Sequence, residues 1–481
     1  MRISEHYNLG LQQPELEFLD VDVLRDAKVF VDPSTFKYID NDWAGECVAL
    51  LQDYYNEVLH GVRSGDARRT GYLLGQLHEP NETHLGLSAE QSRGSGVSDG
   101  LANDLRQALE GSVAVTSGLV SDVEDTLLFV DNIGHDRVSD MTINIVRRPL
   151  IAFTQEMCEK YSIEMVAGLD SGPMWNRHLH RWEVDHVSLP MPSLESGKLI
   201  MVPRAIVRKR GVFDAGDYLQ HFVLPYLQDQ EMQAAQSALV QRRKNGTRYV
   251  TKKDLKERDG KPTKTWNAEV TGDNPGLLQQ YRQAKESDHP AMGQGDLSET
   301  VGTPEANWDA LLADLRAVPS GKKTADDYHW AAQRLLTALL YPALDFPKRE
   351  DKILGGRKRI DITFTNIATD GFFRWLTDNQ KVPAGSVVVE AKNYTDPLAN
   401  PEFDQLTGRF SPRRGQFGLL CYRGIKDDKA KVIQHCRDAA LDDRGYVIAL
   451  DDDDMAKLVE ARKAGDESTF AYLLARFREL I

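Results

Sequence analysis

Cysteine is scarce in this sequence, and the few that occur form no familiar pattern. The chain has 481 residues and four scattered cysteines, Cys47, Cys158, Cys421 and Cys436. Their spacing is neither that of a zinc site nor that of a disulfide framework. No apolar run reaches the length of a membrane span, and the first residues lack the apolar stretch of a signal peptide. We therefore expect a cytoplasmic protein without a membrane partner.

Basic residues are too few to balance the acidic ones, but the imbalance is confined to one part of the chain. Lys and Arg number 59 and Asp and Glu number 73, for a formal net charge of −14. Residues 321–481 hold 26 basic and 25 acidic residues, whereas residues 1–320 hold 33 and 48. The C-terminal part is near neutral and can still bind DNA through a local patch. We expect the acidic N-terminal part to restrain that binding electrostatically.

The N-terminal two thirds alternate short strand-like and helical patterns and carry no catalytic signature. We expect strands at 18–23, 29–33 and 126–130, and helices at 43–63, 136–161 and 222–242. Three features there are interpreted as turns, caps or exposed loops rather than sites: the acidic residues Asp122, Asp125, Asp131, Asp136 and Asp140, the histidines His178, His180 and His186, and the loops at 79–86 and 92–96. The basic stretch 242–264 is either a nucleic-acid contact or a solvated excursion. Residues 287–304, rich in Gly, Ser and Thr, predict a linker.

The strongest pattern lies between residues 357 and 392, where charged side chains interrupt strand-like runs. Asp361 stands between Ile360 and Ile362, and Glu390 and Lys392 follow three consecutive valines. Side chains two apart on a strand share a face, so Glu390 and Lys392 point to one site. Two carboxylates can hold a divalent cation, and an adjacent ammonium can position or help deprotonate an attacking water. This predicts phosphodiester hydrolysis; the competing interpretation is the exposed face of an amphipathic strand.

The elements around these strands follow a definite order. Helical periodicity covers 325–340, 400–410 and 429–441, and strand-like runs cover 359–364, 387–392, 417–422 and 446–450. With one further strand before 359, the order is α-β-β-β-α-β-α-β, and a short helix at 372–376 is inserted before the strand that carries Glu390 and Lys392. This predicts a mixed α/β C-terminal domain.

Asp361, the segment Glu390-Ala391-Lys392-Asn393-Tyr394 and Gln405 resemble the PD-(D/E)xK nuclease superfamily, in the branch of Mrr-like and Shedu-like restriction and anti-phage endonucleases. The resemblance spans residues 321–450. It implies a restriction-endonuclease-like α-β-β-β-α-β core, Asp361 and Glu390 as Mg²⁺ (or Mn²⁺) ligands, Lys392 as the group that positions the attacking water, and Gln405 as a supporting helix residue. It also implies DNA as substrate and a bacterial antiviral defence role with an unknown phage-derived trigger. Because such nucleases commonly pair to cut both strands, we expect a homo-oligomer.

On this basis the chain divides into four parts. Residues 1–210 are expected to form a mixed α+β regulatory or sensing domain, 211–290 a helical, partly basic segment, 291–320 a linker and connecting helix, and 321–481 the nuclease domain. The alternatives are a non-cleaving nucleic-acid-binding module derived from a nuclease, and a nuclease that acts on RNA or repair intermediates.

The sequence departs from the family pattern on its first C-terminal helix. Many relatives carry a Glu there, whereas this chain has His329, which is interpreted as a surface residue, a replacement ligand or a substrate contact. Asp326 and Asp327 nearby suit helix capping. Arg409, Arg413 and Arg414 are placed either to contact a phosphate backbone or to end a solvated helix. The run 451–454 is interpreted as a capping turn.

Overall fold

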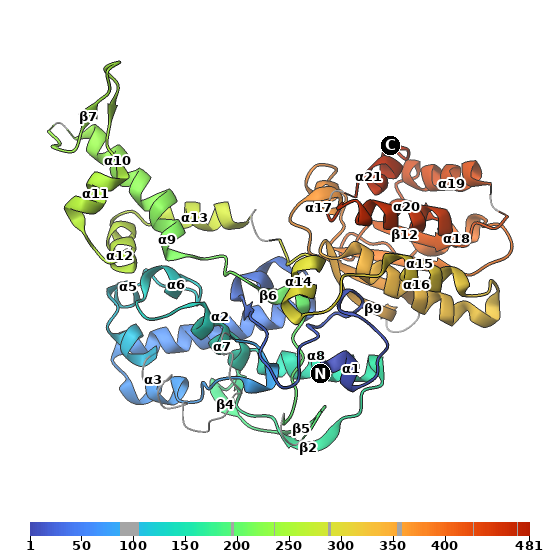
Figure 1. Ribbon diagram of the computed structural model, residues 1–481, viewed down its shortest axis with the longest axis horizontal. Coiled ribbons are helices and arrows are strands. Elements are labelled where there is room, and N and C mark those ends of the chain that lie inside the picture. Colours follow the sequence, from blue (N-terminus) through green and yellow to red (C-terminus); the bar gives the residue numbers. More distant parts are fainter. Residues whose placement is uncertain are drawn as a thin grey trace.

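The computed structural model describes residues 1–86, 105–193, 197–234, 236–286, 290–353, 358–426, 428–468 and 470–481, with no side chains described for 351–353 and 358. The expected loop at 92–96 lies outside this range. Three parts are visible in Figure 1: an N-terminal helical region, a projecting helical arm, and a C-terminal sheet with its helices. One hydrophobic core runs through the first two parts, and a second occupies the third. The fold is therefore mixed α/β, with its five-stranded sheet in the C-terminal part.

The N-terminal region is built around one long helix. The helices here are α1 (Ile3–His6), α2 (Asp42–Ser64), α3 (Ala67–Leu74), α5 (Val113–Thr116), α6 (Asp125–Phe129), α7 (His135–Ile145) and α8 (Arg147–Tyr161). Asn41 caps α2 by accepting the amide of Ala44, and Gly65 ends it at φ +70°. The helix buries Leu50 and Tyr54 in the first core. The helix expected at 43–63 is confirmed.

Small two-stranded sheets surround these helices. Their strands are β1 (Phe30–Val31) with β6 (Val207–Arg208), β2 (Val166–Asp170) with β5 (His186–Leu189), and β3 (Met174–Asn176) with β4 (Arg181–Glu183). The expected strand at 29–33 is thus present as the short β1. The one at 18–23 is wrong, because only isolated bridges form there, from Phe18 to Pro203 and from Arg2 to Asp22.

Two further expectations for this region need correction. The apolar run at 126–130 is the helix α6 and not a strand. Its residues from 125 to 130 are buried, so no polar face reveals the period, and periodicity cannot distinguish a short buried strand from a helix. The helix expected at 136–161 is two helices separated at Val146. Pro149 lies in the first turn of α8, where a missing amide hydrogen costs nothing.

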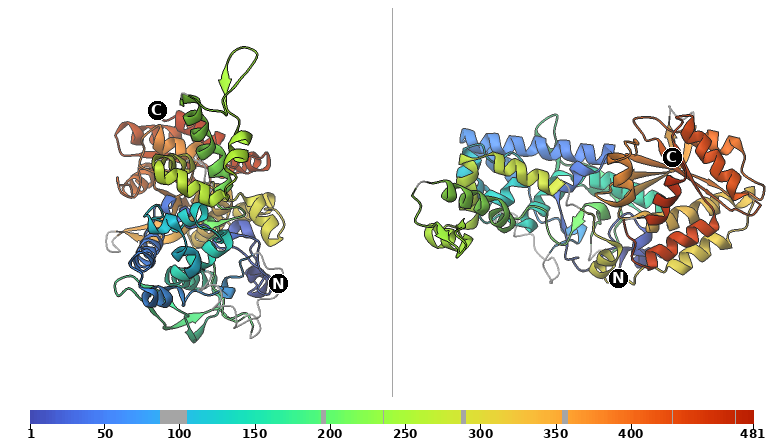
Figure 2. Two further views of the ribbon diagram at one scale, coloured as in Figure 1. Left: turned by 90° about the vertical axis from the view of Figure 1, so that its left-hand side faces the viewer. Right: turned by 90° about the horizontal axis from the view of Figure 1, so that it is seen from above.

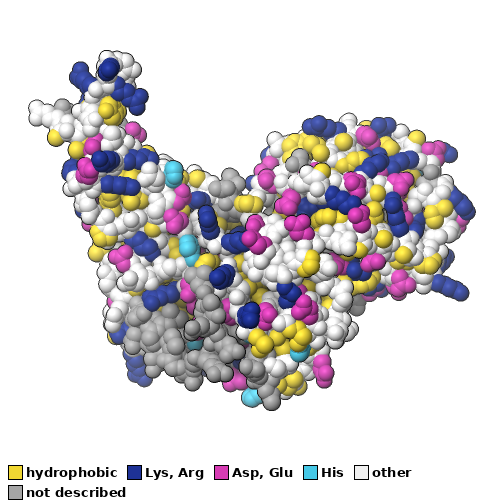
Figure 3. Space-filling model, viewed as in Figure 1, with side chains coloured by type: hydrophobic (Ala, Val, Ile, Leu, Met, Phe, Trp, Pro, Cys, Tyr) yellow, Lys and Arg dark blue, Asp and Glu magenta, His cyan; other side chains and the backbone are white. Residues whose placement is uncertain are grey.

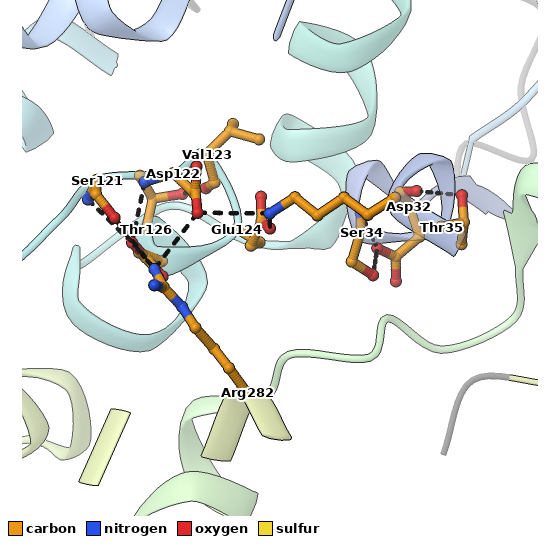
Figure 4. A network of polar contacts seen from close by, with 11 residues as sticks. Asp32, Ser34, Thr35, Ser121, Asp122, Val123, Glu124, Thr126 and Arg282 are labelled. Carbon is orange, nitrogen blue, oxygen red and sulfur yellow. Dashed lines mark hydrogen bonds and ion pairs between the residues drawn. The ribbon is translucent and has the colours of Figure 1, made fainter. Parts of the chain in front are cut away.

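The arm follows the N-terminal region. It contains α9 (Ala215–Tyr218), a π-helical turn (Leu219–Val223), α10 (Leu224–Gln233), the hairpin β7 (Gln241–Arg242) and β8 (Arg248–Tyr249), α11 (Lys252–Asp259), α12 (Thr263–Asp273) and α13 (Gly276–Glu286). The helix expected at 222–242 ends earlier, at Gln233, and the hairpin takes its last residues. Arg282 on α13 reaches Asp122 of the N-terminal region, as Figure 4 shows. It also pairs with Asp125 at 2.7 Å. These ion pairs fix the base of the arm.

The expected linker between the arm and the C-terminal domain is largely helical. Residues 291–320 carry α14 (Gln294–Val301) and α15 (Trp308–Ala317). Gln294 donates to the carbonyl of Ala338, and Leu311 and Leu315 belong to the second core. Both helices are therefore packed against the domains that they connect.

The C-terminal domain is a mixed five-stranded sheet between helices. Its elements are α16 (Ala325–Leu340), β9 (Leu344–Ile353), β10 (Lys358–Asn366), α17 (Gly371–Asp378), β11 (Ser386–Lys392), α18 (Asn400–Thr407), β12 (Phe417–Tyr422), α19 (Lys429–Leu441), β13 (Tyr446–Leu450), α20 (Asp452–Lys463) and α21 (Ala471–Arg478). The strand order is β13-β12-β11-β10-β9, antiparallel from β9 to β11 and parallel from β11 to β13. Helices cover both faces, with α15, α16 and α20 packed together and α18 against α19 (Figure 2). The expected element order is confirmed.

Buried polar contacts join the C-terminal domain to the N-terminal region. Arg204 and Asp345 form a salt bridge with Nη2 3.0 Å from Oδ1, and their side chains are 0% and 1% exposed. The guanidinium lies 3.9 Å from the ring centre of Tyr341 and donates to the carbonyls of Pro14 and Thr337. Asp345 is on β9, next to the strand that carries Asp361. The two parts are thus connected through the sheet itself.

None of the described helices is both long and apolar enough to cross a membrane.

Candidate active site

The first carboxylate of the site lies where the pairing of β10 with β11 ends. Ile362 and Val389 form the last cross-strand pair, and both are fully buried. One residue further, Asp361 points to the opposite face from Ile362 because side chains alternate along a strand. Its Oδ2 accepts the backbone amide of Ala391 at 3.0 Å. This bond places the Asp361 carboxylate against the backbone that carries Glu390 and Lys392.

Glu390 and Lys392 meet on one face of β11, and a helix residue joins them. Lys392 Nζ donates to Glu390 Oε1 at 2.9 Å and to Gln405 Oε1 at 3.1 Å. The Gln405 amide nitrogen donates to the same Glu390 oxygen. Glu390 is fully buried and Lys392 nearly so. The three side chains form a closed triangle supported from α18.

The charges of this triangle are set by burial and by one another. Burial and the charge of Asp361 raise the pKa of Glu390, while Lys392 and Arg409 oppose that rise. Burial disfavours the charged form of Lys392, but Glu390 and Asp361 outweigh it and raise the pKa of this lysine. Lys392 is therefore an ammonium. Two of its three N–H donors are used inside the triangle, and the third remains for a water or a phosphate oxygen.

The donor atoms suit a hard cation. Glu390 Oε2 is buried and has no hydrogen-bond partner in the described part of the structure. An unpaired buried carboxylate oxygen is costly unless a ligand satisfies it. The Asp361 carboxylate and the Ala391 carbonyl supply further oxygens. Among the described residues, no group of three or more His, Cys, Asp or Glu side chains is arranged so that it could hold a metal ion. Two carboxylates with water are nevertheless an ordinary Mg²⁺ site, so the residues fit that ion.

His329 belongs to this site by position. It lies on α16 with its side chain 21% exposed, and its Nε2 is 2.9 Å from the Ala391 carbonyl and 3.8 Å from Asp361 Oδ2. A carbonyl oxygen only accepts, so Nε2 carries the hydrogen in this arrangement. Nδ1 then keeps the lone pair, so the ring nitrogen nearest the Asp361 carboxylate is a hydrogen-bond donor and not the nitrogen that could ligate a metal. The geometry therefore favours a positioning contact over a replacement ligand.

Asn393 was part of the sequence motif, but its contacts could not be foreseen. Its side-chain amide donates to the carbonyls of Pro319, Gly321 and Thr324 at 2.9, 3.1 and 3.2 Å. The backbone carbonyl of Asn393 accepts a hydrogen bond from the backbone amide of Gly321 at 2.8 Å. These bonds connect the end of β11 to the turn that leads into α16. Asn393 thereby fixes the distance between the Glu-x-Lys strand and the helix of His329.

The three arginines after Gln405 separate into different environments. Arg409 is half-buried, its Nε has no partner among the described atoms, and its charge acts on Glu390. Arg414 instead donates to the Arg409 carbonyl at 2.9 Å and so closes the turn after α18. Arg413 is exposed. Only Arg409 is thus near the carboxylates.

The other sequence candidates lie apart from this site. Asp451 and Asp454 form the expected capping box at the start of α20. Asp122 and Asp125 pair with Arg282, whereas burial and the neighbouring acids Asp136, Glu79 and Asp26 raise the pKa of Asp140 to about 8. The histidines His178, His180 and His186 are all exposed.

Comparison with known proteins concerns the N-terminal region. A family model described as a domain of unknown function (DUF8370) matches residues 8–214. Searches of curated proteins and of solved structures gave no match to the chain. The matched range ends just before α9, where the arm begins. The site described above lies outside it.

Proposed function

We propose that this chain is a Mg²⁺- or Mn²⁺-dependent DNA endonuclease with a PD-(D/E)xK core, of the Mrr-like and Shedu-like kind, acting in bacterial antiviral defence or restriction under control of its N-terminal region. The observation that carries the proposal is the buried Glu390 Oε2, which has no partner among the described residues and lies beside Asp361 and Lys392 near the carboxyl end of the central strand β11. Burying a charged group costs desolvation free energy, so such groups are found mainly where they serve a functional site. The order of elements around these strands is the one that the resemblance to the superfamily implies.

Each side chain has a distinct part in the proposed chemistry. Asp361 and Glu390 would hold the cation, which supplies Lewis-acid stabilisation of the charge that develops on the scissile phosphate. Lys392 is kept protonated by two carboxylates, so it orients the attacking water or stabilises the phosphate rather than removing a proton. Gln405 is hydrogen-bonded to both Lys392 and Glu390 and so fixes the positions of these two side chains relative to each other. His329 orients the Ala391 carbonyl between them.

A non-cleaving nucleic-acid-binding module is the second candidate, and one observation favours it. Lys392, Glu390 and Gln405 satisfy one another without any ligand, as in a structural cluster. The unpartnered Glu390 oxygen is what this alternative leaves unexplained.

The proposal is tested by incubating the purified full chain with linear, supercoiled and single-stranded DNA and with RNA, with and without Mg²⁺ or Mn²⁺. We expect metal-dependent cleavage of DNA, stopped by chelation. Binding without cleavage under every condition would favour the non-cleaving module, and cleavage of RNA alone would assign a ribonuclease. Light scattering of the same sample would test the proposed homo-oligomer.

Replacement of His329 should slow cleavage without changing the preferred metal. His329→Ala removes the donor to the Ala391 carbonyl and is expected to cost roughly ten- to a hundred-fold in rate, about 1.4 to 2.7 kcal/mol of barrier. His329→Gln keeps an N–H donor at a similar reach and should retain more activity. The measurement is the initial cleavage rate with Mg²⁺ and with Mn²⁺.

His221, an exposed histidine of the arm, provides the matched control, and His221→Ala should cut at the wild-type rate. If His329 were a ligand, its loss would alter the ratio of Mn²⁺ to Mg²⁺ activity, because imidazole favours the transition metal. An unchanged rate in His329→Ala would make this residue a spectator.

A further inference from the structure

The tip of the arm is a strongly basic surface segment. Residues 241–258 contain eight Lys or Arg and two Asp or Glu. Every residue from 241 to 248 is exposed. Basic side chains gather at this tip in Figure 3, which also shows the molecule hollowed between the arm and the C-terminal domain. The segment therefore projects positive charge away from a chain whose net charge is negative.

Some of these basic groups are already paired, and those near the turn are not. Arg258 pairs with Glu231 and Asp259, and Lys253 pairs with Glu257. By contrast, Arg242 and Arg248 have no partner among the described acidic side chains. The unpaired charge is concentrated on the hairpin, at the end that faces solvent.

The register of the hairpin places like charges against each other. Arg242 of β7 lies directly opposite Arg248 of β8. Like charges directly opposite each other destabilise a strand pair. An anion between the two guanidinium groups would remove that repulsion. The charge contribution to the pairing is thus unfavourable in the free protein and becomes favourable around a phosphate.

The hairpin is also held in a defined conformation. The Arg243 amide donates to the Thr247 carbonyl at 2.9 Å, and Gly246 supplies the positive φ of +83° that the turn requires. Tyr249 donates to Gln241, whose amide donates to Asp254 on α11 at 2.7 Å. Its base is packed through Val250 and Leu255, which are 4% and 0% exposed. A pre-organised basic ribbon loses little entropy on binding.

We propose that the β7–β8 hairpin is a DNA-binding arm, which enters the major groove of a duplex and contacts the phosphates on its edges. A B-form major groove, about 12 Å wide, admits a two-stranded ribbon, whereas the A-form groove of RNA is too narrow and deep for side chains to read. Arg242, Lys244 and Arg248 supply the phosphate contacts. The guanidinium carbon of Arg243 instead lies over the ring of Tyr249, 5.3 Å from its centre. The choice of DNA as partner rests on the proposed function. The arm thereby adds a contact to the substrate on a part of the chain distant in sequence from the catalytic strands.

The test compares two full-length variants with the same change in charge. Arg242→Gln/Lys244→Gln/Arg248→Gln removes the arm's charge, and Arg25→Gln/Lys28→Gln/Arg68→Gln removes three exposed charges from the N-terminal region. Binding to a blunt DNA duplex is followed by fluorescence anisotropy with EDTA, so that no cleavage occurs. The arm variant should bind at least about ten-fold more weakly near 100 mM salt, with the slope of log K against log salt reduced by about two to three. The control should stay within about two-fold of wild type.

Several results would overturn the inference. They are equal affinity and slope for the two variants, no binding of the duplex by wild type at low salt, and arm-dependent binding of RNA duplex as tight as that of DNA. Arm-dependent binding of phosphatidylserine vesicles with DNA affinity unchanged would also overturn it, in favour of a lipid surface. The nuclease proposal fails separately: arm-dependent binding with no cleavage under any metal supports the arm alone, and cleavage with arm-independent binding supports the nuclease alone.

Discussion

Lys392→Ala, Glu390→Ala and Asp361→Ala are each expected to reduce DNA cleavage by at least about a thousand-fold, which corresponds to roughly 4 kcal/mol of transition-state stabilisation. Lys392 is the only described ammonium that bonds to both Glu390 and Gln405. Its removal takes away a positive charge that acts where negative charge develops on the phosphate. Loss of either carboxylate removes half of the anionic charge that would hold the cation. The measurement is nicking and linearisation of supercoiled plasmid with Mg²⁺.

These losses must be separated from misfolding, because the groups are buried. Glu390→Ala leaves the Lys392 charge with a single described bond, and an unpaired buried charge can itself cost stability. Glu390→Gln and Asp361→Asn keep the volume and much of the hydrogen bonding but weaken the hold on a cation. They should melt near the wild-type temperature and still fail to cut. Lys431→Ala, an exposed lysine on α19, should behave as wild type. Near wild-type cutting by all three alanine variants would show that the site is assigned wrongly.

The C-terminal sheet could be predicted closely because the apolar pattern of each segment in the sequence matches its burial in the structure. The bounds expected for α16, β12, α19 and β13 are those of the structure. In β12 and most of β13 the apolar residues are buried on both faces, which produces an unbroken hydrophobic run in the sequence. The helices between these strands show a clear 3.6-residue period. Where the buried residues follow the period of the helix or strand, a single sequence is enough to predict the bounds of that element.

The site could be predicted only in part, for a reason of geometry. Glu390 and Lys392 share a strand, so their common face follows from alternation alone. His329 and Asn393 act through partners 62 and 72 residues away, at Ala391 and Gly321 respectively, and no spacing rule connects them. The sequence alone therefore allows His329 to be a surface residue, a ligand or a substrate contact. Contacts between distant elements depend on packing that a single sequence does not report.

The N-terminal region is attached to the C-terminal domain in a way that its net charge does not reveal. An acidic region on a flexible linker could restrain a nuclease by competing for its DNA-binding face. In the structure that region instead joins the C-terminal domain through the buried Arg204–Asp345 pair and through α14. A fragment starting near Ser320 would also lose Leu311 and Leu315 from the second core. Control by the N-terminal region is therefore better tested at this joint, in the full chain.

Breaking the joint should produce the largest loss of stability of any single change considered for this protein. Arg204→Met leaves the Asp345 carboxylate buried without its bidentate partner, whose Nε and Nη2 donate at 3.2 and 3.0 Å. Removing one partner of a buried pair costs about 3–5 kcal/mol of unfolding free energy. The measurement is urea unfolding, followed by tryptophan fluorescence, with limited proteolysis to locate the region that opens.

The double variant Arg204→Met/Asp345→Leu distinguishes the pair from its surroundings. Replacing both ions by apolar groups is often neutral or stabilising, so the double variant should recover most of the loss. Arg210, an exposed arginine nearby in sequence, gives the control Arg210→Met, which should change stability by less than about 0.5 kcal/mol. Asp345 lies on β9, and β9 pairs with the strand of Asp361 through Ile362 and Arg349. We therefore expect Arg204→Met to disturb cleavage as well as stability, and the double variant to restore both if β9 is the route by which the N-terminal region acts on the site. A double variant that recovers stability but not cleavage would instead show that the ion pair itself carries the influence of the N-terminal region on the site.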